Sequence, residues 1–181
     1  MRKLLLCLTL LVLPSWSAAN DWGAFDRPGA VLLMRHALAP GTGDPSGFEI
    51  GDCSTQRNLD ARGRDQARRI GAELRKRGVD IDAVWTSQWC RCRETAELLD
   101  LGEVREVPSL NSFFSRRSRE DEQTGATLDL LDEHAGDRLM LVTHQVNITS
   151  LTGLFPRSGE IFVAERTEDG LDVTGRILID P

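Results

Sequence analysis

The sequence has no second long apolar segment after its first twenty residues, no internal repeat and no low-complexity tract. Its composition, 40% hydrophobic and 28% charged with 16 Gly and 7 Pro, excludes collagen-like, coiled-coil and mainly disordered proteins. Four cysteines are too few for a disulfide scaffold. Basic residues are not in excess either: the net charge of −6 argues against a nucleic-acid partner, although a local basic patch is compatible with it. The composition therefore predicts a folded globular protein.

The first residues have the pattern of a secretory signal peptide. Arg2 and Lys3 precede an apolar run at residues 4–13, and small residues at 17–19 form a cleavage motif. An apolar run of about ten residues is shorter than the ~20 that cross a bilayer, so we expect no stable membrane insertion. We predict a signal peptide at residues 1–19, a single domain at residues 20–181, and a periplasmic or secreted protein.

Short apolar runs alternate with helical patterns in the rest of the chain. We expect strands at residues 30–34, 81–86, 104–107 and 139–142, helices at 58–77, 88–99, 127–134 and 146–151, and closing antiparallel strands at 161–165 and 173–179. Residues 111–125 show no clear period. This alternation predicts an α/β fold, with three layers (α/β/α) and a mostly parallel central sheet.

Two of the three histidines follow predicted parallel strands. His36 comes after Arg35 at the end of the first strand, and His144 follows the fourth. Ligands of open α/β sheets bind outside the carboxyl ends of the strands, so both histidines are expected at one edge. His134, at the end of a helix, is expected to pack or to cap that helix.

The helix after the second strand adds a basic residue to the same edge. Ser87, where an N-cap belongs, Arg91 and Thr95 are spaced by four and share one helix face. Helix N-termini and arginine side chains both bind phosphate oxygens. Arg35, His36, Arg91 and His144 therefore predict a pocket for a phosphoryl group.

Four short motifs, in this order, carry a resemblance to a known family. They are Val31-Leu32-Leu33-Met34-Arg35-His36; Asn58-Leu59 with Gly63, Gln66 and Ala67; Thr86-Ser87 with Arg91 and Thr95; and Val142-Thr143-His144. The set resembles the histidine phosphatase superfamily, which includes the phosphoglycerate mutases, although Ala37 stands where that family usually has Gly. Residues 52–59 and 89–92 are similar to its small secreted bacterial branch, the periplasmic lipopolysaccharide core heptose phosphate phosphatases.

The resemblance implies a phosphoglycerate mutase-like fold and a phosphatase without cofactor or metal. His36 would attack phosphorus to form a phosphohistidine, while Arg35, Arg91 and a protonated His144 hold the phosphoryl oxygens. The substrate would be a phosphomonoester or phosphoramidate, on a small molecule or a cell-envelope glycan.

The proton donor of that family is missing from its usual places. The third strand is followed by Ser112 where many members have Glu, and Gln145 follows the second histidine where others have Asp. We expect Glu160 to be the general acid. Asp44, Glu49 and Asp52 are the alternatives.

Further contacts with substrate are expected from Ser87 and from three arginines outside the main motifs. Arg57 is expected at the pocket edge. Arg116 and Arg117 lie in a segment with Phe113 and Phe114, which would anchor a loop that attracts an anionic substrate, the alternative being a solvated loop.

The cysteines suggest one disulfide in an oxidising compartment. Cys7 lies in the expected signal peptide, so three cysteines remain. Cys53 is expected to pair with either Cys90 or Cys92, which leaves one thiol over. The spacing Cys90-x-Cys92 matches no standard zinc site. Two other functions stay open at this point: a phosphomutase, and a phosphate-binding module without catalysis. The oligomeric state is not predicted.

Overall fold

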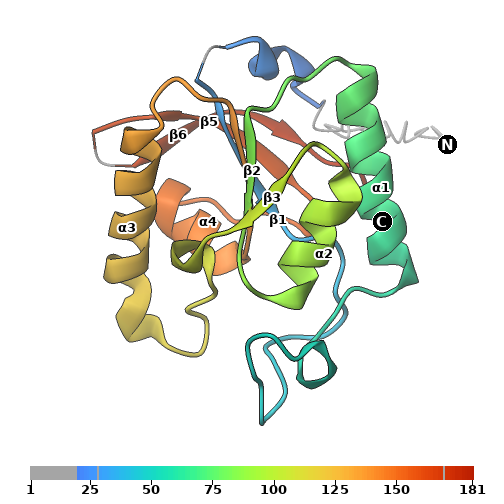
Figure 1. Cartoon of the computed structure of the whole chain (residues 1–181). Coiled ribbons are helices and arrows are strands. Elements are labelled where there is room, and N and C mark those ends of the chain that lie inside the picture. Colours follow the sequence, from blue (N-terminus) through green and yellow to red (C-terminus); the bar gives the residue numbers. More distant parts are fainter. Residues whose placement is uncertain (1–19, 28, 169) are drawn as a thin grey trace, which may run out of the picture.

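The computed structural model describes residues 20–27, 29–168 and 170–181, and the expected signal peptide lies outside them. Six strands in the order β3-β2-β4-β1-β5-β6 form one sheet (Figure 1). The strands are β1 (Val31–Arg35), β2 (Ala83–Thr86), β3 (Val104–Glu106), β4 (Leu139–Thr143), β5 (Ile161–Arg166) and β6 (Leu171–Ile177). The helices are α1 (Ala61–Lys76), α2 (Cys90–Leu99), α3 (Glu120–Glu133) and α4 (Gln145–Thr152).

The sheet is mostly parallel, as the sequence predicts. β1 and β2 both pair with β4 in parallel, and β3 pairs with β2 in parallel. β5 runs antiparallel to β1, and β6 runs antiparallel to β5. The carboxyl ends of β1, β2 and β4 therefore meet at one edge.

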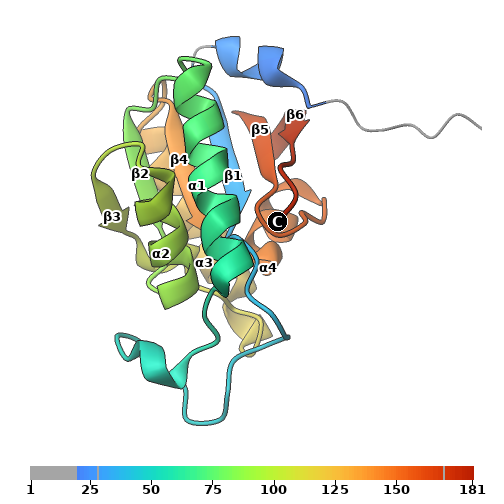
Figure 2. The same ribbon diagram turned by 90° about the vertical axis from the view of Figure 1, so that its right-hand side faces the viewer.

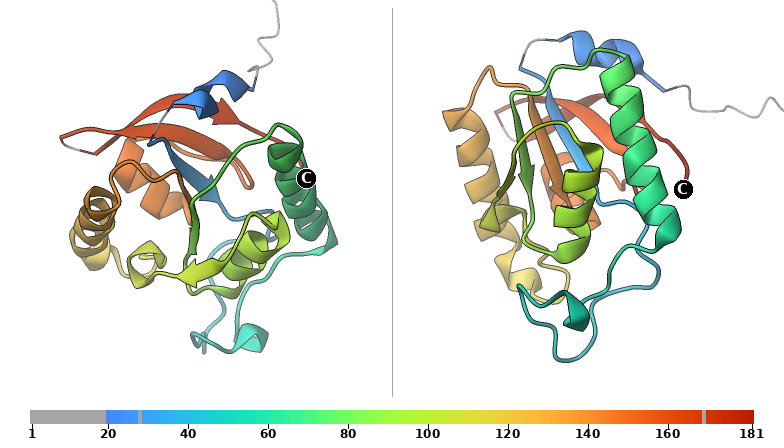
Figure 3. Two further views of the ribbon diagram at one scale, coloured as in Figure 1. Left: turned by 45° about the horizontal axis from the view of Figure 1, so that its top comes forward. Right: turned by 45° about the vertical axis from the view of Figure 1, so that its right-hand side comes forward.

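Helices cover both faces of the sheet, so the three-layer α/β/α prediction is confirmed (Figures 2 and 3). Alternate residues of β1 point to opposite faces: Leu32 and Met34 pack with α1 and α2, whereas Val31 and Leu33 pack with α3 and α4. Because both faces are buried, the strand reads as a continuous apolar run. None of the helices in the described ranges combines the length and the apolar character that a bilayer crossing requires.

The long connection between β1 and α1 extends beyond the carboxyl edge of the sheet (Figures 1 and 2). Its first residues are held against α1. A Cβ at Gly63 would lie 2.0 Å from the carbonyl oxygen of Leu38, so only glycine allows this approach. The buried Gln66 side chain accepts a hydrogen bond from the Leu38 N–H (2.9 Å) and donates to the carbonyls of Ser158 and Ile179 (2.9 and 2.8 Å). Two residues of the second motif thus fix the backbone just after His36.

Several boundaries differ from the predicted ones by two or more residues. α3 starts at Glu120, seven residues earlier than expected. Its first turn carries Glu120, Asp121 and Glu122, which stabilise the positive end of the helix dipole. The helical period is not visible in the sequence, because the buried face of the helix carries polar Gln123 and Thr127. α2 starts at Cys90, with Trp89 as its N-cap residue. β6 begins two residues earlier than predicted, at Leu171, where it pairs with the end of β5.

Candidate active site

A cavity of about 780 Å³ opens at the carboxyl edge of the parallel strands. Four of its lining residues, which we call the floor, come from strand ends and from the first turn of α2: Arg35, His36, Arg91 and His144. The lining residues of segments 41–57 and 111–119 form what we call the wall. The structure therefore brings together the four residues that the sequence singles out for phosphoryl chemistry.

His36 is held in place by hydrogen bonds to two backbone carbonyls. It is 2% exposed, and its backbone N–H donates to the Thr143 carbonyl of the neighbouring strand (3.0 Å). Its Nδ1 lies 2.8 Å from the Ala37 carbonyl oxygen, which can only accept, so Nδ1 carries the proton and Nε2 keeps a free lone pair. Burial, and then the charge of Arg91, lower the pKa of His36 well below its usual value. The ring is therefore neutral at pH 7.

His144 lies edge-on to His36, with the two ring centroids 5.6 Å apart. Arg91 Nη2, a donor only, is 3.4 Å from His144 Nδ1, and Ser87 Oγ is 2.8 Å from Nε2. Nε2 therefore donates to Ser87. Burial, and then the charge of Arg91, lower the pKa of His144 well below its usual value. In the ligand-free protein His144 is thus neutral, in contrast to the protonated residue that the resemblance implies.

The arginines of the cavity leave donors available for an anion. Arg91 is 3% exposed, and Arg35 donates from Nη1 to the Pro156 carbonyl (3.1 Å). The buried Nε atoms of both arginines find no acceptor among the described residues. Arg57 joins them at the cavity edge, where burial and then the charge of Arg91 lower its pKa to about 10, which still leaves it charged at pH 7. Clustered guanidinium groups of this kind suit a phosphoryl dianion.

Glu160, the expected general acid, does not line the cavity. It precedes β5 at the correct edge, but its carboxylate points toward β6. There it accepts hydrogen bonds from Arg176 Nε (3.0 Å) and from the Arg157 backbone N–H (2.7 Å), and it is 5% exposed. The placement is a correction to the sequence-based expectation, since Glu160 lies in the connection before β5, where no strand alternation sets the direction of its side chain.

Of the other carboxylates considered, Asp44 and Glu49 line the cavity. Asp52 lies outside it and caps a short 3₁₀ helix by accepting from the Ser54 N–H (2.9 Å). Ser87, expected both as an N-cap and as a substrate contact, is fully buried and is neither. Its hydroxyl bonds to His144 and accepts from the Trp89 N–H (3.3 Å).

The two expected loop arginines separate in the structure. Arg116 lines the cavity, whereas the Arg117 guanidinium lies over the Phe114 and Phe113 rings (5.6 and 6.0 Å) outside it. Phe113 is buried and anchors the segment, as expected, but Phe114 is 47% exposed and forms part of the wall. His134 caps α3 and packs edge-on against Trp85, as predicted.

An aromatic pair that the sequence patterns did not single out lines the cavity, with Phe48 in the wall and Trp89 just before α2. Phe48 and Trp89 stack with ring centroids 4.8 Å apart, and both line the cavity. The signal for this pair in the sequence is only that both residues are aromatic. Asn111, which stands in the family's acid motif, instead accepts hydrogen bonds from Ser87 Oγ (3.2 Å) and from the Gln88 N–H (2.8 Å).

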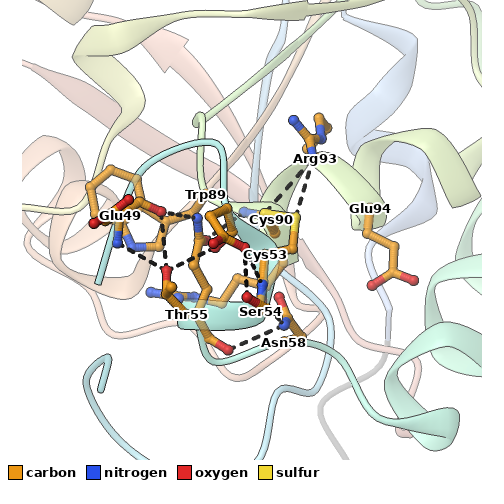
Figure 4. The surroundings of a disulfide bond; sticks show 12 residues. Glu49, Cys53, Ser54, Thr55, Asn58, Trp89, Cys90, Arg93 and Glu94 are labelled. Atoms are coloured by element: carbon orange, nitrogen blue, oxygen red, sulfur yellow. Dashed lines mark hydrogen bonds between the residues drawn. A yellow bond between two sulfur atoms is a disulfide. The ribbon is translucent and has the colours of Figure 1, made fainter. Parts of the chain in front are cut away.

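A disulfide joins Cys53 to Cys90, one of the two expected pairings (Figure 4). It ties the wall to the first residue of α2, next to Arg91. Within the described ranges, Cys92 is the cysteine left free. Its Sγ lies 3.4 Å from His144 Nε2, and burial raises the pKa of the thiol to about 12, so it is uncharged. Among the described residues, no three His, Cys, Asp or Glu side chains gather closely enough to hold a metal ion.

Comparison with known proteins agrees with this geometry. Residues 31–113 match the model of the histidine phosphatase superfamily (branch 1). No curated protein matches the chain. The matched range holds the first three strands with Arg35, His36 and Arg91, and over this range the chain is similar to that superfamily.

Several solved structures share the fold. The protein histidine phosphatase SixA complexed with tungstate is 18% identical, with 82% of this chain and 96% of that chain covered and a TM-score of 0.57. A putative phosphohistidine phosphatase SixA from Agrobacterium tumefaciens is 18% identical (84% and 99% covered, TM-score 0.58). Phosphoserine phosphatase from Entamoeba histolytica is 13% identical (83% and 97% covered, TM-score 0.62). These likenesses show the fold.

Proposed function

We propose that the protein is a phosphatase that hydrolyses a phosphomonoester or phosphoramidate through a phosphohistidine on His36. The observation that carries this proposal is the floor of the cavity: a neutral His36 with a free Nε2, surrounded by two arginines and a second histidine. An uncharged imidazole is nucleophilic near pH 7, and a covalent intermediate divides one difficult displacement into two easier ones.

In the first step, His36 Nε2 attacks phosphorus in line with the leaving group. The N–P bond forms, the bond from phosphorus to the leaving oxygen or nitrogen breaks, and the leaving atom takes up a proton. Arg35 and Arg91 stabilise the charge on the equatorial oxygens, and the Ala37 carbonyl stabilises the developing positive charge on the ring through Nδ1–H. Because the arginines supply this charge, the proposed step uses no metal.

In the second step, water attacks the phosphohistidine. The new O–P bond forms as the N–P bond breaks, inorganic phosphate leaves, and His36 returns to its neutral form. His144, which is held by Ser87 and Arg91 beside His36, donates a hydrogen bond to a phosphoryl oxygen once it is protonated. A bound dianion raises the pKa of a nearby imidazole, so substrate itself favours protonation of His144.

The proton for the leaving group is supplied from the wall. Asp44 and Glu49 are the carboxylates among those considered that line the cavity, and we propose Glu49 in place of Glu160, because Asp44 is held in an ion pair by Arg91. A phosphoramidate needs less assistance, since its bridging nitrogen is protonated more readily than the bridging oxygen of an alkyl ester. The acid is identified by comparing the rate of hydrolysis of an alkyl phosphate, which has a poor leaving group, with that of p-nitrophenyl phosphate. Loss of the donor slows the poor leaving group far more.

The substrate is proposed to be a phosphorylated small molecule or a phosphorylated cell-envelope glycan. The cavity of about 780 Å³ is much larger than a phosphate group, and the Phe48–Trp89 stack offers a flat apolar surface to a ring. Resemblance to the periplasmic heptose phosphate phosphatases makes a sugar phosphate a specific candidate. Neighbouring structures of the same fold are described as phosphatases for phosphohistidine, phosphoserine and α-ribazole-5'-phosphate, so the fold accommodates different leaving groups.

The place of action is proposed to be the periplasm or the exterior of the cell. The Cys53–Cys90 disulfide supports this location, because disulfides persist in oxidising compartments. No metal, nucleic acid or membrane insertion is part of the proposal.

One experiment tests the proposed function. The domain at residues 20–181 is assayed with a panel of phosphate esters beside the His36→Ala variant, and the protein is quenched in acid and base to detect an acid-labile, base-stable phosphoenzyme. We expect activity and phosphoenzyme in the parent, with activity reduced by about 10⁴-fold or more in His36→Ala. A variant as active as the parent removes His36 as the nucleophile. A parent that hydrolyses nothing and forms no phosphoenzyme favours the phosphate-binding module.

A further inference from the structure

Asp44 already occupies the phosphate-binding side of Arg91. The Asp44 Oδ1 atom accepts from Arg91 Nη1 at 2.5 Å, and its Oδ2 accepts from Arg91 Nη2 at 3.2 Å. Trp89 Nε1 donates a third hydrogen bond to Oδ2 at 3.0 Å. This two-pronged contact is the one that an arginine makes with a phosphoryl group.

Arg91 has little capacity left for a second anion while Asp44 is in place. Its side chain is 3% exposed, and both of its terminal nitrogens are directed at the Asp44 carboxylate. Only Nε, which has no acceptor among the described residues, is not engaged. A phosphoryl group that binds Arg91 through both terminal nitrogens must therefore take the position of the carboxylate.

We propose that Asp44 is a displaceable counterion of Arg91, which leaves when the phosphoryl group of the substrate binds. This inference rests on the proposed function, since it assigns Arg91 to phosphoryl binding. In the free protein Asp44 balances a buried guanidinium that would otherwise have no partner charge. In the complex the phosphoryl group replaces it.

The surroundings of Asp44 favour such an exchange. A phosphoryl dianion carries more charge than a carboxylate and also reaches Arg35 and His36, which line the same cavity. Asp44 sits in a glycine-rich loop, in which Gly41, Gly43 and Gly47 all have positive φ. Its side chain is 18% exposed, so it has a path to solvent, whereas Arg91 has none.

The charge state of Asp44 agrees with a counterion. Burial alone would raise the pKa of this carboxyl, but the hydrogen bonds from Arg91 and Trp89 outweigh burial and hold the pKa below its usual value. Asp44 is therefore ionised at pH 7 and competes with phosphate as a full charge.

The competition predicts tighter anion binding when Asp44 is neutralised. Inorganic phosphate is titrated by calorimetry into wild type and into the Asp44→Asn variant, which keeps the shape of the side chain. We expect the Kd for phosphate to fall about tenfold in Asp44→Asn, as loss of a close charge pair implies. Asp52→Asn is the matched control, because Asp52 lies in the same connection but outside the cavity and bonds to Ser54 rather than to an arginine, and its Kd should change less than twofold.

A second measurement reports the movement of Asp44 itself. Phosphate should change the tryptophan fluorescence of wild type, since displacement frees the Trp89 Nε1–H, and the change should be absent from Trp89→Phe. If Asp44→Asn is less stable, saturating phosphate should raise its Tm more than that of wild type. Equal phosphate affinity in Asp44→Asn and Asp52→Asn, or weaker binding in Asp44→Asn, overturns the proposal. Because these readouts need no turnover, they stand apart from the ester assay that tests the proposed function.

Discussion

The floor and the wall of the cavity are built in different ways. The floor residues His36, Arg91 and His144 are 2–3% exposed and follow strand ends or begin a helix, so backbone hydrogen bonds of the sheet set their positions. The wall consists of long connections in which Ile50 and Phe114 are about half exposed. The comparison teaches that the proposed chemistry resides on rigid elements, while the surface proposed to meet the leaving group resides on loops, which tolerate change.

The largest expected effect separates a floor arginine from a wall arginine. Arg91→Lys keeps the charge but loses the two-pronged contact, and we expect kcat/KM to fall about 10²- to 10³-fold. Arg116→Lys, on the exposed wall, should cost less than tenfold. Steady-state kinetics on p-nitrophenyl phosphate measures both. Equal losses would break the distinction between floor and wall.

The disulfide should matter more for stability than for chemistry. The Cys53→Ser/Cys90→Ser variant loses a cross-link between residues 37 positions apart, and we expect the free energy of unfolding to decrease by about 3 to 4 kcal/mol. Because strands hold the floor, kcat at saturating substrate should fall less than tenfold. Urea denaturation and kinetics on the same preparation check the two parts. A loss of activity as large as that of Arg91→Lys would show that the floor depends on the wall.

Stability should also depend on pH through the two buried histidines of the floor. Burial lowers the pKa of His36 and of His144 well below the usual value near 6.5, so the unfolded chain binds protons below that pH that the folded chain does not. The free energy of unfolding should therefore decrease as the pH falls below about 6.5, with no contribution from this pair above it. Urea midpoints at pH 7.5 and 5.5 measure the decrease. His36→Gln and His144→Gln should each lose part of it, and parallel curves for all three proteins would contradict the assignment.

The smallest expected effect lies within the wall. Arg116→Ala should raise KM about three- to tenfold for a substrate with a second negative charge, because an exposed arginine contributes a screened attraction. Arg117→Ala is the matched control, since its guanidinium lies over Phe114 outside the cavity, and its KM should not change. A larger effect of Arg117→Ala than of Arg116→Ala would show that Arg117, rather than Arg116, attracts the substrate.

Much of the fold and of the floor follows from local patterns. The apolar runs at β1 and β4 end at Arg35-His36 and at His144, and the parallel pairing of β1 with β4 brings those ends together. Regular elements convert such a sequence pattern directly into side-chain positions. Successive residues of a strand point to opposite faces of the sheet, and the carboxyl ends of parallel strands lie at the same edge. The start of α3 was missed because its buried face is polar at Gln123 and Thr127.

The sequence by itself determined the α/β class, the four floor residues and the number of cysteines available for a disulfide, since these depend on periodicity and on short motifs. Only the tertiary structure decided the pairing of Cys53 with Cys90, the turn of Glu160 toward Arg176 and the contact of Asp44 with Arg91. Those three features depend on where long connections meet side chains distant in sequence. No local pattern encodes that, because a loop adopts the path that satisfies its partners rather than a repeating geometry.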